Sequence, residues 1–375
     1  MGKWMFFRHI FSLFALVLTL AGCSSLPAVK SAEPEKYVLA PGASESRHFF
    51  TRSGLRLFGQ WWLPSGTPKA VVLLAHGTAV HSGFYDPWTR ELTGRGYAVF
   101  GIDLRGWGQS QGYGRRGSVG KIDEYVEDIE IARREIRRRY PGKPVYLQGE
   151  SLGGAVVLMA HISGRVASDG LVLNAPAVQL NPGRFLGIPN RFAGFGLWTA
   201  AQGAKNIPET PVLPIWKGFT WTVVRDPAVK QRFWEDPSAV HQSLPASFLV
   251  AMQDVTQRLQ QNINNVRIPF IVVHGTRDVL VSREGSELLM AKAVSTDKTL
   301  KVYEGMRHAT LHDIGKDKVW GDITAWLDTH AAQAIAAKAL NPEENTEISD
   351  SGQEEEGPKT AFRSRYQQLT MTTRN

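Results

Sequence analysis

The sequence predicts an α/β protein built on a mostly parallel, doubly wound sheet. Segments with strand character and helix character alternate along most of the chain, which is typical of βαβ units. Several strand segments are continuous apolar runs, as expected for parallel strands that are buried on both faces. Between about residues 178 and 265 the alternation stops, so we expect a helical cap to be inserted there.

The predicted elements follow one another in a regular order. A hairpin is expected over 48–63, with its turn at Arg52-Ser53-Gly54. Apolar runs predict strands at 70–75, 97–102, 145–148, 171–173, 270–273 and 300–303. Helices are expected at 87–95, 122–140, 152–163, 282–294 and 320–340. These elements define a domain over 47–340. The cap at 178–265 is rich in Phe and Trp, and we expect most of these rings to form its own core and a few to line an apolar pocket.

Composition and charge exclude some classes of protein. The chain has 375 residues, of which 43% are hydrophobic, enough for a large globular domain. Its formal net charge is +8, and its densest basic cluster is an arginine group at 133–139. That group ends a predicted helix whose first turns are acidic, an arrangement that the helix dipole favours. We therefore expect a solvated helix and no nucleic-acid partner.

The amino terminus has the features of a secretion signal. Lys3 and Arg8 precede an apolar stretch at 10–20, which is short for a bilayer span. The sequence Leu20-Ala21-Gly22-Cys23-Ser24 then resembles the lipobox of bacterial lipoproteins. The resemblance implies a signal peptide over 1–22, cleavage before Cys23 and a lipid on its sulfur. The alternative is an uncleaved anchor helix over 4–22, which would have to hold Arg8 and His9 within the bilayer.

The lipobox implies a place in the cell. A lipidated Cys23 would tether the chain to a membrane of the bacterial cell envelope, and Ser24 rather than Asp at the next position indicates the outer membrane. Cys23 is the only cysteine, so no intramolecular disulfide can form. Residues 23–46 are polar and are expected to form a linker. Residues 341–375 are expected to form a disordered polar tail, and no protein partner can be identified from them.

The strongest chemical motif is Gly149-Glu150-Ser151-Leu152-Gly153. It lies between an apolar strand segment and a helix-forming run, which is the context that gives the G-x-S-x-G pattern its meaning. The glycines allow a tight turn, and the turn exposes the serine hydroxyl at its apex. Ser151 is therefore the candidate nucleophile.

A serine nucleophile needs a base, and the base needs a carboxylate to orient it. Asp278 and His308 each follow a predicted strand, and the chain order Ser151, Asp278, His308 matches the order of the α/β arrangement. His312 is the alternative base, although a surface or pocket-rim role suits it better. Asp103 is the alternative acid, but it precedes the serine and a turn role suits it better.

Two backbone amides are candidates for the oxyanion hole. One belongs to Thr78, in the loop after the strand at 70–75, and the other to Leu152, the residue after the nucleophile. His76 lies inside the same loop, where a structural hydrogen bond is a better interpretation than a role as the base.

Several segments together resemble one family. The sequence around His76-Gly77-Thr78, Asp103-Leu104-Arg105-Gly106, Gly149–Gly153, Asn174-Ala175-Pro176 and Tyr303-Glu304-Gly305 with His308 is similar to the monoacylglycerol lipase and lysophospholipase branch of the α/β-hydrolases, also labelled serine aminopeptidase-like. The resemblance covers about 47–330. It implies the α/β-hydrolase fold, the same triad and oxyanion amides, and a cap with an apolar entry for an acyl chain. Glu150 departs from the family pattern, which usually has His there.

These observations predict a serine hydrolase that cleaves carboxylic esters of lipid-derived substrates, such as a monoacylglycerol or a lysophospholipid. No metal-ligand spacing is present, so no metal or cofactor is expected. An aminopeptidase with the same triad is one alternative, with Glu150, Glu235 or Asp236 binding the free amine of its substrate. A non-catalytic envelope binding protein on the same fold is the other.

Overall fold

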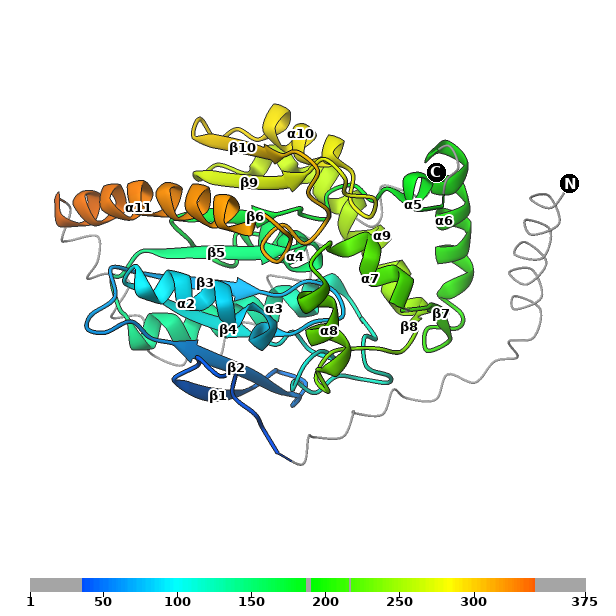
Figure 1. Ribbon diagram of the computed structural model, residues 1–375, viewed down its shortest axis with the longest axis horizontal. Coiled ribbons are helices and arrows are strands. Elements are labelled where there is room, and N and C mark those ends of the chain that lie inside the picture. Colours follow the sequence, from blue (N-terminus) through cyan, green and yellow to red (C-terminus); the bar gives the residue numbers. More distant parts are fainter. Residues whose placement is uncertain (1–35, 187–189, 216, 341–375) are drawn as a thin grey trace, which may run out of the picture. The chain divides into compact units, whose positions relative to one another are not determined.

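An eight-stranded sheet forms the centre of the computed structural model (Figure 1). β1 and β2 join the sheet antiparallel, and all the other neighbouring strands are parallel, as predicted. Across the sheet the order is β1 (Glu45–Phe50), β2 (Arg56–Trp62), β4 (Tyr97–Ile102), β3 (Ala70–Ala75), β5 (Val145–Glu150), β6 (Gly170–Asn174), β9 (Phe270–Gly275) and β10 (Lys298–Tyr303).

The structure describes residues 36–340 except 187–189 and 216. The predicted signal peptide, Cys23 and the predicted tail at 341–375 lie outside the described residues. A first compact unit ends at Ala334, and the second, from Ile335, has only 335–340 described. Within the described ranges, no helix is both long and apolar enough to cross a membrane.

Helices cover both faces of the sheet (Figure 1). On one face lie α2 (Asp86–Gly94), which follows the short helix η1 (Ser82–Tyr85), and α11 (Lys316–Leu340). The rings of Trp88 and Trp320 join these two helices, with centroids 5.6 Å apart. The other face carries α3 (Ile122–Arg139) and α4 (Leu152–Ile162), while α10 (Arg283–Lys292) packs on β9 and β10. Apolar burial on both sides explains why the central strands read as unbroken apolar runs.

The segment between β6 and β9 is mainly helical. Its elements are α5 (Pro182–Leu186), α6 (Asn190–Ala204), β7 (Pro211–Leu213), α7 (Lys217–Val223), α8 (Pro227–Glu235), β8 (Leu244–Pro245), α9 (Ala246–Asn262) and η2 (Ile263–Asn265). The sequence did not predict the antiparallel pair of β7 and β8. Each of these strands is short and contains a proline, so neither gives an apolar alternation that could be recognised.

The aromatic rings of this cap divide into two groups. Phe233 is buried against Trp234, as expected for a core of the cap. Phe195, Trp198 and Trp221 are instead 67%, 50% and 58% exposed. The first two stack on each other along α6, with centroids 6.1 Å apart. The cap therefore leaves large apolar rings on its surface.

The end of the predicted linker is bound to the domain. The amide of Val38 donates to Gln109, that of Ala40 to Gln60 and that of Gly42 to Asp86. β1 also begins at Glu45, two residues before the predicted start of the domain. The polar composition of this stretch concealed these contacts, because the backbone makes them and the side chains that accept them lie far along the chain.

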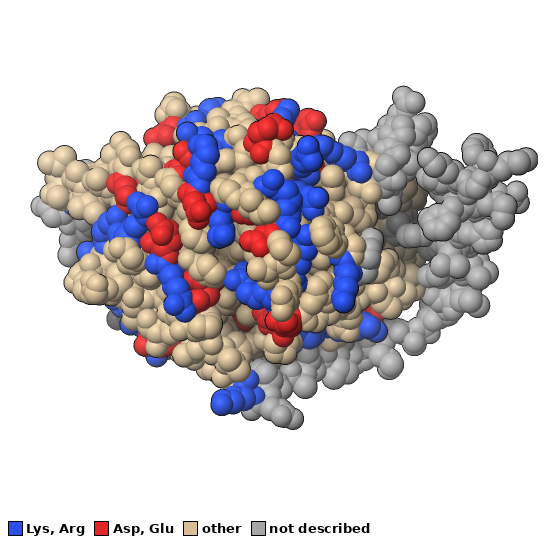
Figure 2. Space-filling view, in the orientation of Figure 1, with Lys and Arg blue, Asp and Glu red and all other residues tan. Residues whose placement is uncertain are grey.

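The basic end of α3 is neutralised locally. Arg134 and Arg138 pair with glutamates on the same helix, and Arg139 pairs with Glu45. On the face shown in Figure 2, basic and acidic side chains are interspersed. These pairs agree with a solvated helix.

One buried ion pair supports the loop after β4. The guanidinium of Arg105 donates to Asp128 on α3 from Nη2 at 2.5 Å and from Nε at 2.9 Å. The backbone amide of Arg105 donates to the other oxygen of Asp128 at 3.0 Å. Arg105 is 4% exposed and also pairs with Glu127 at 2.8 Å, whereas Asp128 is fully buried and Arg105 is the cation that neutralises it.

We expect Arg105→Met to lower the free energy of unfolding by about 3–5 kcal/mol, because it leaves a carboxylate buried without its cation. Arg95→Met is the matched control, since it breaks the exposed pair with Glu91 and should cost at most about 1 kcal/mol. Urea denaturation at neutral pH measures both. Equal losses of unfolding free energy for the two variants would contradict a stabilising role for the buried pair of Arg105 and Asp128.

Candidate active site

Ser151 lies at the apex of a strained turn between β5 and α4. Its backbone has φ 55° and ψ −114°, a conformation that non-glycine residues rarely adopt. A Cβ on Gly149 would lie 2.3 Å from the carbonyl oxygen of Gly153. A Cβ on Gly153 would lie 2.2 Å from that of Ala75, at the end of β3. Both glycines are therefore required by close backbone contact, and not only by the turn itself.

Hydrogen bonds from neighbouring segments hold this turn. The amide of Ser151 donates to the carbonyl of Asn174 at 2.9 Å, and its carbonyl accepts from Ala177 at 3.1 Å. α4 begins at Leu152, so its first N–H groups lie at the turn without intrahelical acceptors. The amide of Leu152 is the first of these groups.

The structure brings two of the predicted residues into direct contact. Nδ1 of His308 lies 2.7 Å from Oδ2 of Asp278, and both side chains are buried. They come from the loops after β10 and β9, which are parallel neighbours in the sheet. The hydroxyl of Ser151 makes no hydrogen bond to His308 in the described part of the chain. Contacts of this kind are often long before substrate binds.

Asp278 is surrounded by donors. Its Oδ1 accepts from the amides of Leu280 at 2.8 Å and Val281 at 3.0 Å, and Nε2 of His274 lies 3.2 Å from Oδ2. Burial alone would raise the pKa of Asp278, but the charge of His308 and the hydrogen bonds from His274 and His308 hold it well below its usual range. Asp278 is therefore an ionised acceptor at neutral pH.

The surroundings of His308 favour its protonated form. Burial alone would lower the pKa of His308, but the charge of Asp278, its hydrogen bond and the nearby Glu150 raise it above the ordinary value. An imidazole held in this way can accept a proton and keep the resulting cation stable.

The two alternative residues have other partners. Asp103 accepts from the amide and hydroxyl of Ser82 and from the amide of Gln109, which is the turn role expected for it. His312 was expected at the surface or a pocket rim, but it is 4% exposed. It packs against the rings of Phe84 and Tyr85, and burial lowers its pKa to about 3. The expected surface position was therefore wrong, because these two rings cover His312.

His76 makes the structural hydrogen bonds that the sequence suggested. Its Nδ1 bonds to the carbonyl of Gly77 at 2.7 Å, and its Nε2 accepts from the amide of Leu104 at 3.0 Å. Burial lowers the pKa of His76 to about 4, so the ring is neutral. It ties the loop of Gly77 and Thr78 to the loop after β4.

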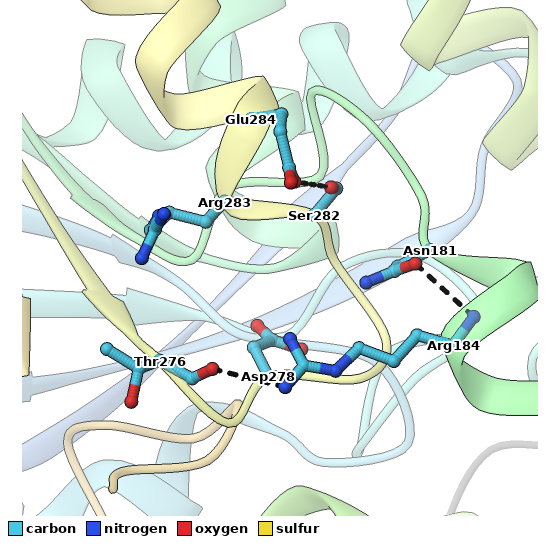
Figure 3. A pocket seen from close by; sticks show the side chains of 8 residues that line it. Asn181, Arg184, Thr276, Asp278, Ser282, Arg283 and Glu284 are labelled. Atoms are coloured by element: carbon cyan, nitrogen blue, oxygen red, sulfur yellow. Dashed lines mark hydrogen bonds between the residues drawn. The ribbon is translucent and has the colours of Figure 1, made fainter. Parts of the chain in front are cut away.

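A polar cavity of about 290 Å³ lies beside Asp278 (Figure 3). Figure 3 shows Arg184 extending from α5 toward the carbonyl of Thr276, which it reaches at 3.4 Å. A second cavity, of about 250 Å³, lies between the loop after β6 and the helices α6 and α9. Neither cavity is lined by Ser151 or His308.

Sequence reasoning missed three residues that support the site. His274 shares Asp278 with His308, and its position at the end of β9 was a signal that could have been used. Tyr85, on η1, accepts from the amide of Gly77 in the loop that carries Thr78. Buried Asp313 accepts from the amides of Arg225 and Arg307, and so joins the cap to the loop of His308. No sequence signal indicates Tyr85 or Asp313, because folding alone brings each of them to its partners.

A metal centre is not evident, because the part of the chain that the structure describes has no group of three or more metal-ligating side chains.

Comparison with known proteins agrees with this geometry. A model of the family described as serine aminopeptidase, S33, matches residues 66–315. Homo sapiens monoglyceride lipase is 30% identical over 292 residues, or 77% of this chain and 92% of that protein. Mycolicibacterium smegmatis monoacylglycerol lipase is 30% identical over 291 residues, or 77% of this chain and 99% of that protein.

Solved structures give the same result for the fold. The monoacylglycerol lipase of Paleococcus ferrophilus has a TM-score of 0.61 at 26% identity, covering 73% of this chain and 99% of that one. The monoglyceride lipase of Saccharomyces cerevisiae has a TM-score of 0.67 at 22% identity, covering 79% of this chain and 99% of that one.

The family model covers more than half of the chain, and the two relatives are matched over 92% and 99% of their own lengths. The predicted α/β-hydrolase fold and the predicted class of ester hydrolase are confirmed, and the chain belongs to the serine aminopeptidase S33 family.

Proposed function

We propose that the chain hydrolyses carboxylic esters of lipid-derived substrates, such as a monoacylglycerol or a lysophospholipid, with Ser151, His308 and Asp278 as its triad. The observation that carries the proposal is the 2.7 Å contact between His308 and Asp278, which lies at the same edge of the parallel sheet as the strained turn of Ser151. Strand-end loops of a parallel sheet are where this chemistry is assembled.

In the proposed reaction the hydroxyl of Ser151 attacks the ester carbonyl while Nε2 of His308 takes its proton. Asp278 fixes the tautomer of His308 and stabilises its cation. The amides of Thr78 and Leu152 donate to the oxyanion. His308 then gives the proton to the leaving alcohol, and water hydrolyses the acyl-serine by the same route.

Two observations favour a lipid-derived substrate. The relatives with the family's domain include proteins named monoglyceride or monoacylglycerol lipases from a bacterium and a mammal. The cap also exposes the rings of Phe195, Trp198 and Trp221, which suit contact with an apolar surface.

The aminopeptidase alternative has less support. Asp236 is engaged by Nε2 of His81 at 2.7 Å and by the amide of Ser238 at 2.8 Å. Glu235 is exposed, and Glu150 is buried against a tyrosine. Of the three, Asp236 is engaged by other groups, Glu150 is buried at 5% exposure, and Glu235 lies at the surface of the cap, so none offers an accessible carboxylate beside Ser151 for the amine of a peptide substrate. The binding-protein alternative has no specific observation in its favour.

We also propose that the chain works on a lipid anchor at Cys23, in the bacterial cell envelope and on the outer membrane. The lipobox sequence supports this placement, and a tether would hold the site near lipid-derived esters.

Ser151→Ala should abolish labelling by a fluorophosphonate probe and lower turnover of a monoacylglycerol by roughly three to six decades. The wild-type chain should hydrolyse the monoacylglycerol and leave an aminoacyl anilide nearly untouched. Faster cleavage of the anilide would favour the aminopeptidase, and a folded wild-type chain that takes no label would favour the binding protein.

Asp278→Asn should lower turnover about 10⁴-fold. The new side chain's oxygen would stay with the amides of Leu280 and Val281, so its NH₂ group would face His308. Nδ1 of His308 would then have to be an acceptor, with its proton on Nε2, the wrong tautomer for a base. Steady-state kinetics on a folded variant checks this, and turnover within tenfold of wild type would move the acid role to Asp103.

Cys23→Ala should remove the label when cells expressing the full chain are fed a clickable fatty acid, because only the sulfur of Cys23 can carry the diacylglyceryl group. The unsubstituted chain is the control. Unchanged labelling of the variant would contradict lipidation at this cysteine.

A further inference from the structure

Three groups from separate segments meet beside the turn of Ser151. The hydroxyl of Tyr85, at the end of η1, accepts from the amide of Gly77 at 2.9 Å. The same hydroxyl donates to Oε1 of Glu150 at 3.1 Å. Gly77 precedes Thr78 in the loop after β3, and Glu150 precedes Ser151. The chain of hydrogen bonds therefore joins the candidate oxyanion loop to the nucleophile turn.

The contact is tight and dry. Tyr85 and Gly77 are buried, and Glu150 is 5% exposed. A Cβ on Gly77 would lie 3.3 Å from Oε1 of Glu150 and 3.4 Å from the hydroxyl of Tyr85. The loop therefore lies directly against both groups, and the absence of a side chain at Gly77 leaves room for them.

We propose that Glu150 is a positioning residue, which acts through the hydroxyl of Tyr85 to fix the loop that carries the Thr78 amide. This inference rests on the proposed function, because it assigns the loop a role in binding the oxyanion. An oxyanion donor stabilises the transition state only if it is held in place before the reaction. Tyr85 uses its one proton for Glu150, so the hydroxyl oxygen is oriented to accept from Gly77.

The cost of burying Glu150 supports a role beyond packing. Its Oε2 is buried and has no hydrogen-bond partner among the described residues. A buried carboxyl that is only half satisfied is destabilising, and an apolar side chain would avoid that cost.

The groups that face Glu150 come from three segments: Tyr85 lies on η1, Asp278 follows β9 and His308 follows β10. Behind Tyr85, the ring of His312 packs against the tyrosine ring with centroids 4.8 Å apart. Burial raises the pKa of Glu150 to about 7, while the charge of His308 and the bond from Tyr85 oppose the rise. Glu150 in turn raises the pKa of His308, so the two groups are linked electrostatically.

Two substitutions separate the hydrogen bond from the charge. Tyr85→Phe removes the bridge and keeps the ring, so kcat should fall by about 10- to 100-fold through misplacement of the loop, with KM little changed. Glu150→Gln keeps an acceptor for Tyr85 and removes the charge, so kcat should fall less. It should also move the acidic limb of the kcat/KM profile to lower pH, because the charge no longer raises the pKa of His308.

Tyr97→Phe is the matched control. Its hydroxyl donates to Asp328 at 2.8 Å, so this variant also loses a tyrosine–carboxylate bond. Tyr97 begins β4, and the candidate site lies at the other edge of the sheet, where the parallel strands end. The test is steady-state kinetics of the full chain on a monoacylglycerol between pH 5 and 9, with thermal unfolding of each variant. A Glu150→Leu variant and its combination with Tyr85→Phe complete a cycle, and the double variant should be no slower than the slower single one.

The inference is overturned if Tyr85→Phe loses no more kcat than Tyr97→Phe, or if the losses of Tyr85→Phe and Glu150→Leu multiply in the double variant. An acidic limb that stays in place in Glu150→Gln would overturn the electrostatic link. Each of these results requires an active wild-type chain that the fluorophosphonate labels. An inactive, unlabelled wild type would instead refute the proposed function itself.

Discussion

The backbone contact between the turn of Ser151 and the end of β3 is the constraint on which the site depends. At Gly153 even one methyl group would overlap the carbonyls of Ala75 and His76. β3 and β5 are adjacent parallel strands, so both leave the sheet at the same edge. The candidate nucleophile and the candidate oxyanion loop are thus brought together by strand pairing, and their separation is set by backbone atoms.

The second feature is a set of charges held out of water. Asp278 stays ionised because two backbone amides and two histidines satisfy it. Asp313 has the same kind of surroundings, and it links Arg225 of the cap to the loop of His308. In a dry interior such bonds fix geometry strongly, because an unsatisfied carboxylate would be costly. The loop of His308, the proposed base, is therefore positioned from the sheet side and from the cap side.

The fold and the candidate site residues can be predicted from the sequence where they depend on neighbours along the chain. The strand, turn and helix around Ser151 form one local pattern, and Asp278 and His308 each follow a recognisable apolar run. The sequence predicts less where partners are remote. Tyr85 is 65 residues from Glu150, and no local pattern indicates their bond. The burial of His312 was missed for the same reason, since it depends on how this residue packs against the rings of Phe84 and Tyr85.

Glu150 lies close to the loop of Gly77 and Thr78 and is linked electrostatically to His308, so it acts on both charges that the proposed reaction creates. An ionised Glu150 stabilises the cation of His308, whereas it opposes the negative oxyanion at the loop. A protonated Glu150 is neutral, so it loses the favourable effect on the cation and the unfavourable effect on the oxyanion together. Because burial raises its pKa to about 7, neither form is strongly excluded near neutral pH, and the bond from Tyr85 can be kept in both. A histidine at this position, which the family pattern usually has, would act with the opposite sign, because its protonated form would oppose the His308 cation and stabilise the oxyanion.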